Sequence, residues 1–136
     1  IDGDDWWVIN SMKKKARVFI LEYASGLPNE LPLICKEGCG TVNSWKPNGP
    51  TMNGYYGANM LAFYKLMKQK GYQFVTSLSD NAFFVLNEEF HKLGINEISE
   101  QDMINNYFNP SKYWAETHRD HQNNEWVVME SREFNT

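Results

Sequence analysis

A helix pattern that passes directly into an apolar strand most constrains how this chain can fold. Residues 54–75 read GYYGANMLAFYKLMKQKGYQFV, with apolar side chains at helical spacing between glycines. Asn53 or Gly54 suits the start of such a helix, and Gly71 ends it after lysines that favour a helix C-terminus. Residues 72–78 then predict a strand. A helix that leads into an apolar strand is typical of α/β folds with parallel strands.

Two further apolar segments complete the predicted sheet. Residues 16–24, ARVFILEYA, are a continuous apolar run, which is typical of a strand buried on both faces of a parallel sheet. Residues 82–87 follow residues 72–78 after the short turn LSDN, and so short a connection predicts antiparallel neighbours. The predicted fold class is therefore α/β, with a mostly parallel sheet and one final antiparallel strand.

The first residues predict the end of a strand followed by a helix. The helix is expected from Trp6 to about Lys14, because acidic residues precede it and lysines crowd its end. Two or three complete parallel strands would leave a sheet with an open edge. We therefore expect the chain to be the second half of a larger domain, with Val18, Ile20 and Phe84 less covered than in an intact domain.

Composition narrows the classes of partner. The chain has 136 residues and a net charge of −4, with acidic and basic residues mixed along it, which does not indicate a nucleic-acid partner. It holds no apolar run of about 18 residues, so no membrane partner is expected. Cys35 and Cys39 are interpreted as free thiols in a reduced compartment, with a disulfide or half of a zinc site as alternatives. The predicted location is the cytoplasm.

Four segments of the chain resemble one protein family. IDGDDWWV, VFILEY, YYGANMLAFYKLMKQKGYQFV and NAFFVLNEEF resemble successive motifs of the FkbM-like methyltransferases and their uncharacterised relatives, which are class I S-adenosylmethionine-dependent enzymes. The resemblance covers residues 1–90 and implies the C-terminal half of a Rossmann-like methyltransferase fold. In that fold the final strand runs antiparallel and is inserted beside its neighbour, so the resemblance implies that residues 82–87 lie beside residues 17–23 as well as residues 72–78. Residues 91–136 add nothing to it and are interpreted as a helical or irregular extension. The resemblance implies S-adenosylmethionine as cofactor, although the glycine-rich turn that carries most cofactor contacts in that fold is absent from these residues.

The candidate site follows from the rule that ligands gather outside the carboxyl ends of parallel strands. With the resemblance, this rule makes Asp2 and Asp4 the candidate catalytic residues, which take a proton from a substrate hydroxyl or hold a divalent cation. We expect their carboxylates to converge with that of Glu22. In the alternative interpretation, Asp4 and Asp5 only cap a helix. Cofactor contacts are predicted for Trp6 and Trp7, and substrate contacts for Glu22, Tyr23, Asn53, Tyr55 and Tyr56.

The implied activity is methyl transfer to the oxygen of a small-molecule or sugar hydroxyl. The implied partners are this small-molecule acceptor and the missing N-terminal half of the domain. The chain alone is expected to be inactive and to bind S-adenosylmethionine weakly or not at all. Two alternatives stay open, because a fold does not determine a function. One is a non-catalytic interaction module, and the other is a different α/β enzyme with a carboxylate-bound metal.

Overall fold

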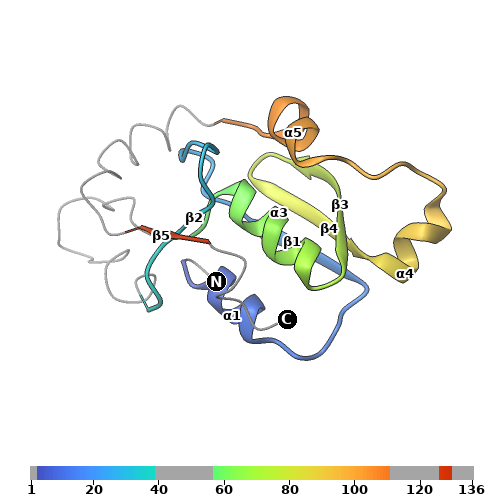
Figure 1. Ribbon diagram of the computed structural model, residues 1–136, viewed down its shortest axis with the longest axis horizontal. Coiled ribbons are helices and arrows are strands. Elements are labelled where there is room, and N and C mark those ends of the chain that lie inside the picture. Colours follow the sequence, from blue (N-terminus) through green and yellow to red (C-terminus); the bar gives the residue numbers. More distant parts are fainter. Residues whose placement is uncertain (1–2, 39–56, 111–125, 130–136) are drawn as a thin grey trace.

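The computed structural model describes residues 3–38, 57–110 and 126–129. Its centre is a three-stranded sheet with the order β1-β4-β3, against which helix α3 packs (Figure 1). The three strands are β1 (Val18–Glu22), β3 (Tyr72–Leu78) and β4 (Asn81–Leu86). The middle strand β4 is antiparallel to both of its neighbours. The predicted pairing of the last strand with both other strands is therefore confirmed.

The predicted mostly parallel, Rossmann-like sheet is wrong. Every strand pair among the described residues is antiparallel, including the small second sheet of β2 (Leu33–Ile34) and β5 (Val127–Val128). Both β1 and β3 oppose β4 and so run in the same direction, as a helix between two strands predicts. However, β4 lies between them, and no parallel pair forms. The described residues thus form two small antiparallel sheets with helices.

A tight hairpin joins β3 and β4, as the LSDN segment predicts. The loop holds only Ser79 and Asp80, because Leu78 is already paired with Asn81. Ser79 adopts a φ of 56°, the left-handed conformation that two-residue hairpin loops favour. The hairpin register shifts between Phe74 and Thr76, which marks a β-bulge in β3.

One face of the three-stranded sheet carries the core, and the other face is exposed. Phe74 and Phe84 are buried and meet edge to face at 5.7 Å between ring centres. On the opposite face, Val18 and Ile20 are 51% and 57% exposed. The prediction that the strand around residues 16–24 is buried on both faces is therefore wrong. The expected exposure is found for Val18 and Ile20 but not for Phe84, which is 1% exposed.

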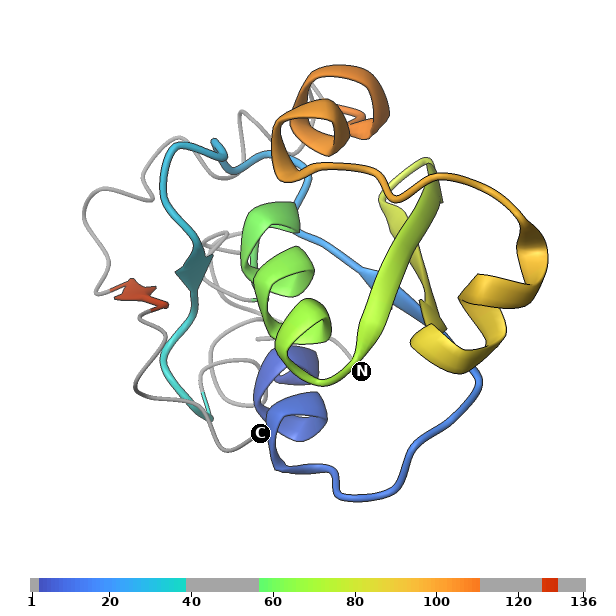
Figure 2. The same ribbon diagram turned by 45° about the vertical axis from the view of Figure 1, so that its right-hand side comes forward.

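Helix α3 (Met60–Gln69) lies between the three-stranded sheet and β2 (Figure 2). It begins after Asn59, later than the predicted start at Asn53 or Gly54, which lie outside the described residues. Gly57 has a φ of +79° and so cannot be helical. At the other end, Gly71 adopts a φ of 92° directly after the C-cap, as the glycine stop predicts.

Helix α1 (Asp5–Ser11) is shorter than the sequence predicts. The chain turns to extended backbone at Met12, so the lysines that follow lie beyond the helix. The carbonyl groups at its end are instead reached by Lys70, whose Nζ donates to Asn10 O at 3.0 Å and Met12 O at 3.1 Å. This contact ties the C-terminal end of α1 to that of α3.

The segment after β4 packs onto the same core. It contains α4 (Asn87–Phe90), a 3₁₀ turn at His91–Leu93, α5 (Glu100–Asp102) and a π-helical turn at Met103–Tyr107. Ser99 Oγ accepts a hydrogen bond from Asp102 N at 3.1 Å and so caps α5. Met103 is fully buried, and Tyr64 Oη on α3 donates to Ile98 O at 2.7 Å. Residues 98–103 therefore help to enclose the core.

Candidate functional site

Three chain segments that the sequence assigns to one site do meet at the C-terminal end of β1. Ala24 N, just after β1, donates to Ala58 O at 2.8 Å. Gly57 N donates to Gly3 O at 3.1 Å, and Gly57 O accepts from Cys35 N at 2.8 Å. These bonds join the segment after β1, the segment before α1 and the segment before α3. The backbone arrangement therefore brings Gly3, Ala24 and Gly57 together, and two of these adjoin the described candidate residues Asp4 and Tyr23 in the sequence.

Asp4 uses its carboxylate to hold a neighbouring loop. Its Oδ1 accepts a hydrogen bond from Gly38 N at 3.0 Å. The side chain makes no capping bond to the amides of α1, although Asp4 is the N-cap residue. The interpretation in which the Asp4 carboxylate caps the helix is therefore wrong. The carboxylate is half-buried at the edge of the predicted site, and its catalytic role stays a prediction.

The two tryptophans of α1 have different surroundings. Trp6 is fully buried, and its Nε1 donates to Ala62 O on α3 at 3.2 Å. Trp7 is half-buried and meets Trp6 edge to face at 5.0 Å, while its Nε1 donates to Cys35 O at 2.7 Å. Both rings thus have clear structural roles in joining α1 to its neighbours, and their predicted contact with a cofactor stays a prediction.

Glu22 and Tyr23 at the end of β1 face opposite sides of the sheet. Glu22 is exposed, on the same face as Ile20. Tyr23 is 2% exposed, and its hydroxyl donates to Ser79 O at 2.8 Å and accepts from Asn109 N at 3.2 Å. The hydroxyl therefore links the end of β1 to the hairpin loop and to the segment after the π-helical turn. The predicted substrate contacts of both residues stay predictions.

Several predicted site residues lie outside the described residues, namely Asp2, Asn53, Tyr55 and Tyr56. The expected convergence of Asp2, Asp4 and Glu22 is therefore not tested. Within residues 3–38, 57–110 and 126–129, no three His, Cys, Asp or Glu side chains are grouped so that they could hold a metal ion. Over the same ranges, no helix has the length and apolar character that crossing a bilayer requires.

Asn59 is the best-connected polar side chain of this region. It is fully buried, and its Oδ1 accepts from Ala62 N at 2.9 Å and Leu33 N at 3.1 Å. Its Nδ2 donates to Pro28 O and Leu31 O, both at 2.7 Å. One side chain thus caps α3 and fixes residues 28–33 beside it. The available signal was an asparagine directly before an apolar helical pattern, a preferred N-cap residue.

Cys35 corrects the interpretation of the two cysteines as free thiols. It is fully buried and disulfide-bonded. The sequence holds one other cysteine, Cys39, which lies outside the described residues. A disulfide was one of the alternatives that the sequence left open. The interpretation of the cysteines as free thiols is wrong for Cys35.

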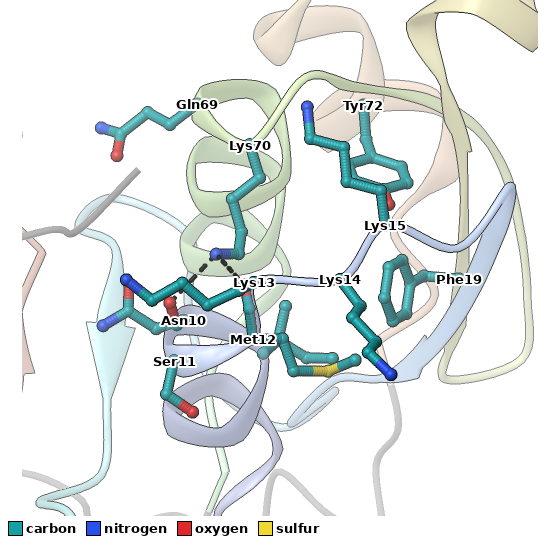
Figure 3. A pocket seen from close by; sticks show the side chains of 11 residues that line it. Asn10, Ser11, Met12, Lys13, Lys14, Lys15, Phe19, Gln69, Lys70 and Tyr72 are labelled. Carbon is teal, nitrogen blue, oxygen red and sulfur yellow. Dashed lines mark hydrogen bonds between the residues drawn. The ribbon is translucent and has the colours of Figure 1, made fainter.

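Sequence reasoning missed a cavity of about 650 Å³ at the other end of β1. It lies where the C-terminal ends of α1 and α3 approach the first residues of β1 and β3 (Figure 3). Four lysines line it: Lys13, Lys14, Lys15 and Lys70. The run of three lysines was visible in the sequence, but it was assigned to a helix end, and nothing placed Lys70 beside it.

No protein-family model, curated protein or solved structure matches the chain.

Proposed function

We propose that this chain contributes part of an S-adenosylmethionine-dependent methyltransferase that acts on the hydroxyl of a small molecule or sugar. The proposal starts from the resemblance of residues 1–90 to FkbM-like enzymes. The observation that carries it is the meeting of three segments at the C-terminal end of β1, through the bonds of Gly57 to Gly3 and of Ala24 to Ala58. These are the segments in which the resemblance places the catalytic and substrate-binding residues. The order β1-β4-β3, with β4 antiparallel to both neighbours, also supports it.

Little acid–base chemistry is required of the protein in such a reaction. The sulfonium of S-adenosylmethionine is already activated, so the protein mainly aligns the acceptor oxygen with the methyl group and removes the hydroxyl proton. Asp2 is the proposed base or cation ligand. Asp4, whose Oδ1 accepts from Gly38 N, keeps a second oxygen that could take the same role or orient the acceptor.

The second candidate is a non-catalytic interaction module. The observation that favours it is the exposed apolar face of β1, where Val18 and Ile20 lie on a strand at the edge of the sheet among the described residues. An exposed edge strand with apolar side chains is a common docking surface for another protein segment. The third alternative, a carboxylate-bound metal enzyme, has no grouped metal ligands among the described residues to support it.

The test is transfer of a radiolabelled methyl group from S-adenosylmethionine to a panel of sugars and small alcohols. The protein should be expressed from its complete reading frame, and each reaction should be run with and without a chelator. Transfer to a hydroxyl that is lost in Asp2→Asn supports the proposal. If no acceptor is methylated and the reading frame encodes no strand followed by Gly-x-Gly upstream of Ile1, the interaction module replaces it.

A cytoplasmic location also belongs to this proposal, but the disulfide bond of Cys35 is evidence against it. Stable disulfides are typical of oxidising compartments, and the free-thiol interpretation on which the prediction rested is wrong for Cys35. Fractionation of cells that express a tagged chain decides the point. Recovery in the cytosolic fraction supports the prediction, and recovery in a secretory fraction contradicts it.

A further inference from the structure

The cavity at the lysine-lined end of the sheet is separate from the proposed methyl-transfer site. Phe19, near the start of β1, and Tyr72, the first residue of β3, line the cavity there, whereas Glu22 and Tyr23 lie at the other end of β1. Its volume of about 650 Å³ falls inside the range of roughly 300–1,000 Å³ that holds small-molecule ligands. The cavity is thus large enough for a ligand of nucleotide size.

The lining concentrates positive charge without a balancing acid. Eleven described residues line the cavity; four of them are lysines and none is acidic, in a chain whose net charge is −4. Within the described residues, no carboxylate forms a salt bridge with Lys13, Lys14 or Lys15. Burial lowers the pKa of Lys70, and the positive charges of Lys13 and Lys15 lower this pKa further. An anion between these ammonium groups would relieve their mutual repulsion.

Capping of the helix ends explains only part of this charge. Lys70 donates to the last carbonyl groups of α1, as a cation at a helix C-terminus should. Lys15 Nζ lies by the end of α3, only 3.4 Å from where a β-carbon on Gly71 would stand. Among the described residues, Lys13 makes no such contact, and Figure 3 shows its side chain extending toward Asn10. The charge therefore exceeds what the two helix ends require.

The remaining walls specify the rest of the ligand. Phe19 is half-buried and meets Tyr72 edge to face at 5.2 Å, beside Met12. This part of the wall is apolar and suits a ring.

We propose that this cavity binds a small phosphate monoester whose body carries a ring. The phosphate lies between Lys13, Lys15 and Lys70, and the ring packs against Phe19. A nucleoside monophosphate has this combination of groups and fits the volume.

Calorimetry with three probes tests the proposal on the full chain. The probes are adenosine monophosphate, adenosine and inorganic phosphate. The test variant is the double substitution Lys13→Gln and Lys15→Gln, which removes two charges and keeps side chains of similar length. The control is Lys92→Gln, which removes a lysine that pairs with Glu89 and does not line the cavity. Thermal unfolding of each variant verifies that it is folded.

The expected result is saturable binding of adenosine monophosphate with a Kd below about 1 mM. Adenosine and inorganic phosphate should each bind at least about tenfold more weakly, because each lacks one half of the contacts. The double variant should weaken the binding of adenosine monophosphate by about tenfold or more, and Lys92→Gln should leave it unchanged. Absence of saturable binding, equal affinity for adenosine or for inorganic phosphate, or unchanged affinity in the folded double variant would each overturn the proposal.

Discussion

Replacing Asn59 by alanine should destabilise the fold far more than removing an ordinary helix cap. The substitution deletes four hydrogen bonds, two accepted by Oδ1 and two donated by Nδ2. All four partners are backbone groups, and the side chain at their centre is fully buried. Water therefore cannot readily replace the lost bonds, and the segment 28–33 loses three of the bonds that hold it to the start of α3.

The magnitude follows from the number of bonds. A net contribution of about 1 kcal/mol for each bond gives a loss of about 4 kcal/mol in the free energy of unfolding. Small domains are typically stable by about 5–15 kcal/mol, so Asn59→Ala should bring the chain close to unfolding. Asn59→Ser keeps the capping acceptor and should lose about 3 kcal/mol, because only the bond to Ala62 N survives.

Urea unfolding followed by tryptophan fluorescence measures this loss, because Trp6 is buried in the core. The matched control is Ser99→Ala, which deletes one exposed capping bond to Asp102 N and should cost about 1 kcal/mol. A loss in Asn59→Ala no larger than that in Ser99→Ala would refute the reasoning. It would mean that the bonds to Pro28, Leu31 and Leu33 contribute nothing to stability.

Three further outcomes are expected. Burial raises the pKa of Tyr64, with smaller contributions from Glu100 and Glu97. The contribution of this pKa shift to stability is complete below the ordinary tyrosine pKa of about 10. It is lost as the pH rises through the folded-state pKa of Tyr64. Tyr64→Phe should therefore lose less stability than the wild type between about pH 8 and about pH 11, and urea unfolding that shows equal losses would contradict this. Cys35 should resist alkylation under denaturing conditions unless a reductant is added, as measured by mass spectrometry, and a labelled Cys35 without reductant would show a free thiol. In the complete protein, Asp2→Asn should lower kcat about 100-fold, the usual scale for losing a general base, and should change stability little. Normal turnover in this variant would show that Asp2 is not the base.

Local features of the fold could be predicted from the sequence because short-range rules determine them. The two-residue loop at Ser79 and Asp80 makes the β3–β4 hairpin almost obligatory. Gly71 ends α3 and Ser99 caps α5, as their positions in the sequence indicate. The position of β4 beside β1 was also predicted, but from the resemblance and not from any local rule.

Long-range features could not be predicted from periodicity. Val18 and Ile20 read as core residues in an apolar run, but β1 packs on one face only, so both are exposed. The crossover rule correctly gives β1 and β3 the same direction, yet it says nothing about a third strand between them. Because β4 lies between β1 and β3, both pairs of this sheet are antiparallel, and the predicted mostly parallel sheet is wrong.

The candidate site was predictable only in outline. The meeting of the segments around Gly3, Ala24 and Gly57 follows from where strands and helices end. Individual side-chain contacts did not follow, because they depend on tertiary neighbours. The Asp4 carboxylate accepts a bond from Gly38 N and caps no amide of its own helix. Lys13 and Lys70 line one cavity although they lie far apart in the sequence.

Binding of S-adenosylmethionine to the protein expressed from its complete reading frame tests the proposed function most directly. Calorimetry should show saturable binding with a Kd on the order of micromolar, together with competition by S-adenosylhomocysteine, which shares every group of the cofactor except the methyl. Denatured protein serves as the control for non-specific heat. Absence of saturable binding by the folded protein would contradict the methyltransferase assignment and leave the interaction module as the better account of this chain.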